Sequence, residues 1–159
     1  MNVFTMNLVL AVAWAALTGT LSIASLATGF VIGYAVLWLI QPLIGASTYF
    51  RRVLAWIRLI VMFLYELLVS SVEVAWDIIT PRHKARPAII EMPLSVTSDT
   101  GILLVTNLIS LTPGTLSLDV SADRKTLRVH AMFADDPEAL CASLKNGMER
   151  WVIDAVEAP

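Results

Sequence analysis

Four ionisable side chains lie on one side of an apolar segment near the middle of the chain. If residues 52–79 form a helix with Arg58 at zero, Glu66 falls at about 80°, Glu73 at about 60° and Asp77 at about 100°. A charge at membrane depth costs several kcal/mol unless it is paired or hydrated. This polar stripe (Arg58, Glu66, Glu73 and Asp77) is therefore expected to face another polypeptide, a water-filled cavity or the membrane interface.

Two kinds of chemistry are open to the polar stripe. In the first, Glu66 lines a route for an ion or a proton. In the second, Glu66 pairs with a cation on a neighbouring helix, while Arg58, Glu73 and Asp77 reach the headgroup regions from the two helix ends. The second interpretation is the simpler one, since it requires only an intersubunit contact.

The rest of the sequence offers no catalytic constellation. It has no glycine-rich phosphate loop, no CxxC, no HExxH and no GxSxG motif. The two histidines, His83 and His130, are too few for a self-contained zinc site, and the single cysteine, Cys141, excludes an internal disulfide framework. The net charge is −2 with no basic tract, which argues against nucleic acid as a partner. We expect no enzyme activity, no metal and no cofactor.

The composition indicates an integral membrane protein. Hydrophobic residues make up 57% of the chain, whereas a soluble domain has about 45–50%. Residues 1–50 contain no Asp, Glu, Lys or Arg. A cleaved signal peptide is not expected, because residues 1–7 carry no positive charge and the apolar tract runs over residues 6–40.

The apolar tract must fold back on itself. As one helix it would be about 52 Å long, against a hydrocarbon core of about 30 Å. Thr18-Gly19-Thr20 is the local cluster of turn formers, so we expect helices over residues 2–17 and 21–40. Both are rich in small residues, and Gly29 with Gly33 forms a small-xxx-small pair suited to close helix packing in lipid.

The middle of the chain is expected to hold the third helix. Gln41-Pro42 ends the second helix, since proline disfavours helix in the residue before it. Residues 43–50 form a connector, and the third helix spans 52–79 and ends at Thr80-Pro81.

Alternation and capping signals predict a small α+β domain after this helix. Asp136 caps the last helix and Ser98 or Asp99 the first, while strands 115–120 and 126–132 form a hairpin. The expected elements are a strand at 88–92, a helix at 102–111, the two hairpin strands and a helix ending near 156. The predicted fold is thus three transmembrane helices, the first two a short hairpin, then a domain of β-α-β-β-α order.

The expected boundary separates a transmembrane domain, 1–80, from a cytoplasmic α+β domain, 81–159. Arg51 and Arg52 lie at one end of the third helix, and Arg82, Lys84 and Arg86 at the other. The excess of basic residues after the helix favours a cytoplasmic C-terminus and an external N-terminus. This predicts a multi-pass membrane protein.

The run NLISLTPGTL at residues 107–116, followed by LDV at 118–120 and LRVHA at 127–131, carries a family resemblance. Together with the apolar hairpin, the third helix and the α/β tail, it resembles the E subunit of the Mrp-type multisubunit cation/proton antiporters. Within this run we single out a candidate docking corner between helix and strand. It consists of Asn107, Thr112, Pro113, Gly114 and Thr115. Plain turn chemistry explains these residues equally well.

The resemblance implies membership of a complex of the bacterial inner membrane that exchanges Na⁺ for protons and supports pH and salt homeostasis. The chain would be an accessory or assembly subunit, with the other subunits and membrane lipid as its partners. Two alternatives stay open: a direct part in the cation path through Glu66, Glu73 or Asp77, and a membrane-tethered adaptor whose α/β domain binds a soluble partner.

Overall fold

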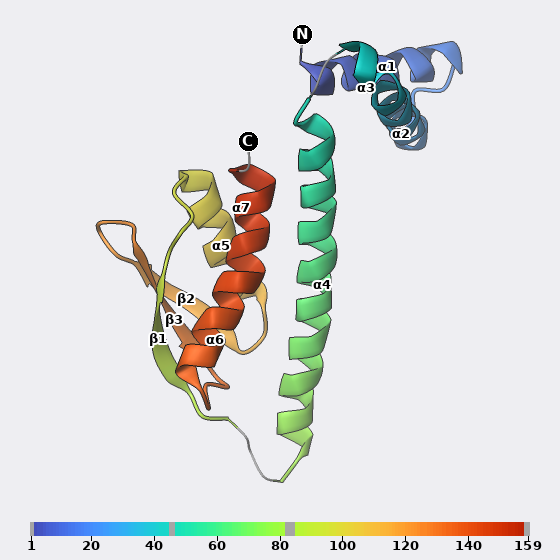
Figure 1. Ribbon diagram of the computed structural model, residues 1–159. Coiled ribbons are helices and arrows are strands. Elements are labelled where there is room, and N and C mark those ends of the chain that lie inside the picture. The colour runs from blue at the N-terminus through green and yellow to red at the C-terminus, as the bar shows by residue number, and fades with distance from the viewer. Residues whose placement is uncertain (1, 45–46, 82–84, 158–159) are drawn as a thin grey trace. The chain divides into compact units, whose positions relative to one another are not determined.

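The computed structural model describes residues 2–44, 47–81 and 85–157 (Figure 1). The chain divides into two compact units, Met1–Arg51 and Arg52–Pro159. The basic residues Arg82 and Lys84, on which the topology expectation depends in part, lie outside the described residues, as does His83.

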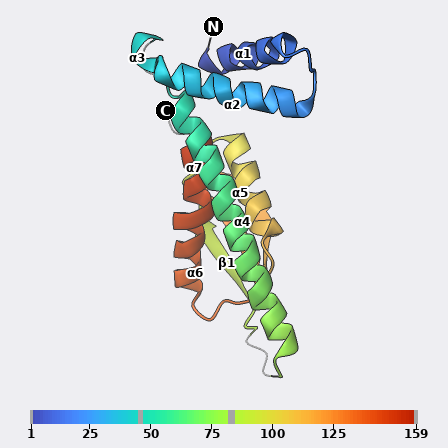
Figure 2. The same ribbon diagram turned by 90° about the vertical axis from the view of Figure 1, so that its right-hand side faces the viewer.

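The first unit is an antiparallel helical hairpin. Helices α1 (Val3–Leu17) and α2 (Ile23–Leu39) lie side by side (Figure 2). The chain reverses between them at Gly19, whose φ of +67° is in the left-handed region that favours glycine. The predicted turn at residues 18–20 is therefore confirmed. The side chains of Asn2 and Ser22 accept hydrogen bonds from the first turns and cap the two helices.

Small residues bring the two helix backbones together. A Cβ at Gly29 would lie 2.9 Å from the carbonyl oxygen of Ala11, and one at Gly33 would overlap the Asn7 side chain. The buried residues recur every fourth position on both helices: Asn7, Ala11 and Ala15 on α1, and Gly29, Gly33 and Leu37 on α2. The predicted close packing at the glycine pair is confirmed.

The connector after α2 differs from the expectation. Residues Gln41–Ile44 form a further helical turn, α3, and the next helix begins at Tyr49 rather than at residue 52. Pro42 occupies the first turn of α3, where a missing N–H costs nothing because first-turn N–H groups have no partner within the helix.

Helix α4 (Tyr49–Ile79) has 31 residues and is about 46 Å long. Of the helices that the structure describes, α4 is the one long and apolar enough to cross a membrane, while α1 and α2 are shorter apolar helices. Within the described part of α4, Leu59 is the only buried apolar side chain. The helix ends at Thr80-Pro81, as predicted.

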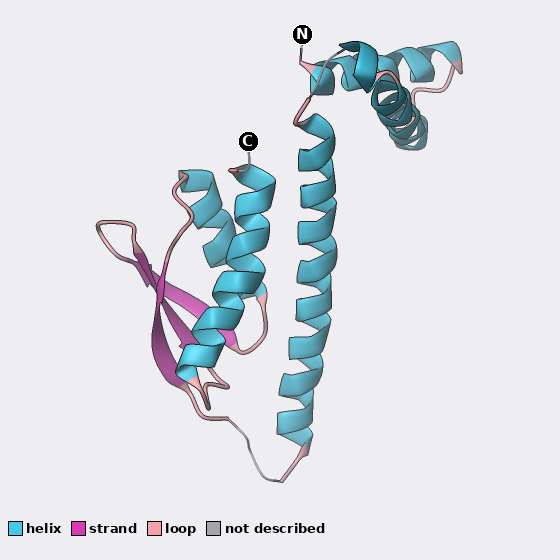
Figure 3. Cartoon of the chain, viewed as in Figure 1, coloured by secondary structure: helices cyan, strands magenta, loops and turns pink. Residues whose placement is uncertain are grey.

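The C-terminal elements form a small sheet covered by helices on one face (Figure 3). Strand β3 (Thr126–Ala131) pairs antiparallel with β1 (Ala88–Pro93) on one side and β2 (Thr115–Val120) on the other. Helix α5 (Asp99–Leu111) and the segment α6 (Pro137–Leu144), η1 (Lys145–Glu149) and α7 (Arg150–Val156) pack on it. The predicted combination of helices with a three-stranded antiparallel sheet is confirmed.

Apolar side chains from the sheet and from all the covering helices build the core of this domain. Such an α+β layer buries one face of the sheet and leaves the other open. The largest fully buried apolar side chains of the domain are Met92, Val105, Ile109, Leu127, Val129 and Val152.

Strand β2 departs from the regular alternation that the sequence suggests. A register shift between Ser117 and Asp119 marks a bulge. Regular alternation would place Leu116, Leu118 and Val120 on one face, but the extra residue turns Val120 toward the core while the two leucines stay exposed.

The last helix is not continuous, contrary to the prediction of one helix to residue 156. A π-helical segment, η1, separates α6 from α7. The wider turn allows the adjacent residues Met148 and Glu149 both to be buried.

Candidate functional site

All four residues of the polar stripe lie on α4, but in different surroundings. Arg58 and Glu73 are exposed, Glu66 is half-buried and Asp77 is 4% exposed. Within residues 2–44, 47–81 and 85–157, no ion pair involves Arg58, Glu66 or Glu73. The structure thus brings all four groups onto one helix, and three of them, Arg58, Glu66 and Glu73, form no ion pair with a described residue.

The spacing along α4 shows why Glu66 needs a partner from elsewhere. At 1.5 Å per residue, Glu66 lies about 12 Å from Arg58 and about 10 Å from Glu73 along the axis. Neither distance allows a direct contact. The half-buried Ser70 hydroxyl, one turn on, donates to the Glu66 main-chain carbonyl at 2.6 Å, so it does not serve the carboxylate, and no described residue forms an ion pair with that carboxylate.

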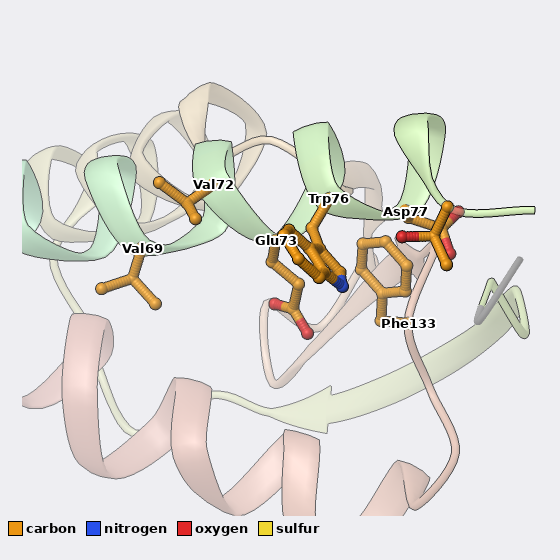
Figure 4. A pocket seen from close by; sticks show the side chains of 7 residues that line it. Val69, Val72, Glu73, Trp76, Asp77 and Phe133 are labelled. Atoms are coloured by element: carbon orange, nitrogen blue, oxygen red, sulfur yellow. The ribbon is translucent and has the colours of Figure 1, made fainter.

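A pocket of about 400 Å³ lies at the C-terminal end of α4 (Figure 4). Glu73 and Asp77 are one turn apart, and the rings of Trp76 and Phe133 lie between them in this view. The pocket is lined by Val69, Val72, Glu73, Trp76, Asp77, Thr80 and Phe133. Carboxylates beside aromatic rings suit a cationic group such as a Lys or Arg side chain. The described residues contain no group of three or more His, Cys, Asp or Glu side chains that could hold a metal ion.

The candidate docking corner consists of residues with local hydrogen bonds. The Asn107 amide donates to the Leu103 carbonyl at 2.8 Å, within its own helix. The Thr115 hydroxyl donates to the Ile109 carbonyl at 2.6 Å, which closes the turn that follows α5.

Backbone conformation completes this corner. Gly114 has a φ of +89°, and the buried Thr112 hydroxyl donates to the Leu108 carbonyl at 2.8 Å. Pro113, between them, is half-buried. These contacts account for the turn chemistry, and a docking role for the corner stays a prediction.

Two carboxylates that sequence reasoning missed hold the loop after β1. The Glu149 carboxylate, 1% exposed, accepts hydrogen bonds from the N–H groups of Ser95 and Val96, the latter at 3.0 Å. Glu157 accepts from the N–H groups of Thr97 and Ser98 at 2.9 and 2.6 Å. Both carboxylates therefore stabilise the link between β1 and α5.

The environment of Glu157 shifts its titration. Desolvation alone raises the pKa of Glu157, but the hydrogen bonds from Ser98 and Thr97 outweigh it, so its pKa lies below the ordinary value.

A polar contact also lies inside the charge-free hairpin. The Asn7 side chain is fully buried, and its amide donates to the Tyr49 hydroxyl at 2.8 Å. No conventional donor among the described residues reaches its amide oxygen. That oxygen lies where a Cβ at position 33 would fall, so the space that it occupies depends on Gly33. The sequence signal that could have pointed to this contact is the position of Asn7, a polar amide at the start of a long apolar tract.

The comparisons with known proteins agree on one family. The family described as "Na+/H+ ion antiporter subunit" matches residues 7–155. The E subunit of the Na(+)/H(+) antiporter of Alkalihalophilus pseudofirmus is 30% identical over 152 residues, covering 96% of both chains. The chain belongs to this antiporter-subunit family. The corresponding E subunit of Bacillus subtilis is 31% identical, covering 92% of this chain and 93% of that protein.

Two solved membrane complexes contain chains of similar structure. A chain of the Mrp complex from Dietzia has 28% identity and a TM-score of 0.51, covering 65% of this chain and 94% of that one. A chain of the membrane-bound sulfane sulfur reductase, an archaeal respiratory membrane complex, has 25% identity and a TM-score of 0.58, covering 97% of each. The recognition of an E subunit from the sequence is therefore confirmed, and with it a membrane location and a place among transporter subunits.

Proposed function

We propose that the chain is an accessory subunit of a multisubunit Na⁺/H⁺ antiporter, in which it supports assembly and thereby Na⁺/H⁺ exchange for pH and salt homeostasis. The observation that carries this proposal is the surface of α4. This apolar helix of 31 residues has one buried apolar side chain among those described, and its Arg58, Glu66 and Glu73 side chains form no ion pair with a described residue. Lipid and neighbouring subunits supply the cover that such a helix needs.

In the proposed arrangement, residues 1–80 form a multi-pass membrane domain of three spans and residues 81–159 a cytoplasmic α+β domain. Helices α1 and α2 have 15 and 17 residues, about 23 and 26 Å, which is near the lower limit for a span. Leu59 is buried in the hydrophobic core cluster of its unit. Insertion of α4 into the membrane replaces this contact with lipid or a neighbouring helix. Transport rather than catalysis is the role that such a chain serves, and it needs no cofactor.

Within this function the polar stripe has two possible roles. As an intersubunit contact, Glu66 pairs with a cationic side chain of a neighbouring subunit. As part of the cation path, Glu66 exchanges ions with Glu73 and Asp77, which line the pocket at the end of α4. We favour the contact role, because the long axial distance from Glu66 to Glu73 provides no continuous chain of carboxylates along α4.

The experiment measures Na⁺-dependent proton movement in everted vesicles. The vesicles come from cells that express the whole complex with Glu66→Gln. A native gel reports assembly in the same membranes. Asp119→Asn, an exposed carboxylate on β2, serves as the matched control. Full assembly with near-normal antiport supports the contact role, whereas full assembly with lost antiport places Glu66 in the cation path.

The adaptor alternative makes a different prediction for the same cells. If the α/β domain served only to bind a soluble protein, deletion of residues 87–159 would leave both the assembled complex and its antiport unchanged.

A further inference from the structure

The two edges of the sheet differ in how their backbone groups are satisfied. On β2, the outward N–H of Thr115 donates to the Thr112 carbonyl at 3.2 Å, and that of Ser117 donates to the Ser110 hydroxyl at 3.1 Å. The bulge after Ser117 then interrupts the edge. These are devices that keep a strand edge from pairing with another chain.

Strand β1 is closed only at its end, where Pro93 has no N–H and its carbonyl accepts from Lys145, while its middle is open. The N–H of Leu94 donates to the Lys125 carbonyl at 2.8 Å, which fixes the alternation of the antiparallel ladder with β3. Ile90 and Met92 therefore bond to β3, and Ile89 and Glu91 direct their N–H and C=O groups outward. No hydrogen bond from either outward N–H reaches another residue in the part of the chain that the structure describes.

A groove of about 530 Å³ runs beside this free edge. Most of its lining residues are apolar, and the lining also includes the carboxylates of Glu91 and Glu138. It is lined by Ile89, Ile90, Glu91, Pro137, Glu138, Cys141, Ala142 and Lys145.

Of the three charged side chains that line the groove, Glu91 and Lys145 have charged partners and Glu138 has none within the described residues. Lys145 is occupied, because its ammonium donates to the Pro93 carbonyl at 2.8 Å and lies 4.0 Å from the Glu149 carboxylate. Glu91 has an exposed partner, Arg128, at 3.5 Å, and Glu138 has no ion pair within the described residues. An incoming strand would therefore meet unopposed negative charge at Glu138.

We propose that the free edge of β1 pairs with an extended, basic segment of another subunit of the antiporter complex. The segment adds a fourth strand through the backbone groups of Ile89 and Glu91, as in β-strand addition. One apolar side chain lies over Cys141, and a Lys or Arg side chain lies opposite Glu138. The inference rests on the proposed function, since it takes the partner from the same complex.

The first test uses photocrosslinking in membranes that contain the whole complex. A benzophenone amino acid is placed at Ile89, which is 63% exposed, and in a matched control at Leu103 of α5, which is 61% exposed. We expect several-fold more adduct to another subunit from position 89 than from position 103, with the crosslink in a segment that contains Lys or Arg. An adduct between two copies of this chain, or equal yields from both positions, would overturn the proposal.

The second test uses the chain's own single cysteine, so that no substitution disturbs the fold. Cys141 lines the groove and is half-buried and free. Maleimide labelling of Cys141 is compared between the full chain expressed alone and the chain in the complete complex. We expect several-fold slower labelling in the complex, and equal rates would overturn the proposal.

A native gel separates this inference from the proposed function. If the chain is absent from the complex, both fail together. If the chain is present but position 89 gives no adduct, only the edge-pairing inference fails.

Discussion

Removal of the Glu149 carboxylate should release the loop between β1 and α5. Glu149→Leu leaves the N–H groups of Ser95 and Val96 without their acceptor. Val96 is buried whereas Ser95 is exposed to water, so the full penalty of about 1–3 kcal/mol applies to the Val96 N–H alone, and we expect a loss of at least that size. That is a substantial part of the roughly 5–15 kcal/mol that stabilises an ordinary domain.

Glu149→Gln removes the negative charge but keeps the size of the side chain, so it measures the contribution of the charge alone. The amide oxygen still accepts both bonds, but charge-assisted hydrogen bonds are roughly twice as strong as neutral ones, so we expect a loss of about 1–2 kcal/mol. Glu138→Gln, on the exposed side of the same helical segment, should change stability by less than about 0.5 kcal/mol.

Hydrogen exchange followed by mass spectrometry measures the effect in the full chain in detergent. Amide exchange in residues 94–98 should be faster in Glu149→Gln by roughly tenfold, since 1.4 kcal/mol corresponds to a factor of ten. Exchange should be faster still in Glu149→Leu. Unchanged protection of these residues in Glu149→Leu would refute the claim that this carboxylate holds the loop.

Three further predictions follow from single contacts. Gly33→Leu should separate α1 from α2, because the new side chain overlaps Asn7, and native gels should show less assembled complex than with the exposed control Val31→Leu. Gly114→Ala should lower stability by about 1–2 kcal/mol, because alanine is strained at a φ of +89°, and thermal unfolding in detergent measures this. Since its pKa is lowered, Glu157 contributes stability above its ordinary pKa of 4.5 that is lost as the pH falls through the folded value, and Glu157→Gln should flatten acid unfolding in that range.

Hydrophobic patterning and turn chemistry account for what could be predicted of the fold. Gly19 stands near the middle of the apolar tract between two threonines, and glycine suits a left-handed turn, so the hairpin could be located from sequence. The capping residues Ser98 and Asp136 likewise located two helix starts. The short α3 was missed because Pro42, which ends one helix, can also stand in the first turn of the next.

The contacts that could not be predicted depend on departures from regular periodicity. Counted from Leu144 at 100° per residue, Met148 falls at about 40° but Glu149 at about 140°, on the polar side of a regular helix. The π segment changes that phase, and the sequence carries no signal for it. The bulge in β2, which turns Val120 inward, is likewise set by contacts across the sheet.

The partner of Glu66 in the polar stripe could not be predicted from the sequence of one chain. The spacing of Glu66 and Asp77 placed both on one helix, and the continuous α4 agrees with that. No described residue forms an ion pair with Glu66, and the proposed contact would come from a neighbouring subunit that this sequence does not contain.

The most direct test of the accessory-subunit proposal is removal of the whole chain. Everted vesicles from cells that express the other subunits alone should show neither Na⁺-dependent antiport nor the full-size complex on native gels. Both should return when this chain is supplied in trans, either as the natural sequence or as Glu66→Gln. An intact complex with normal antiport in the absence of the chain would contradict the proposal.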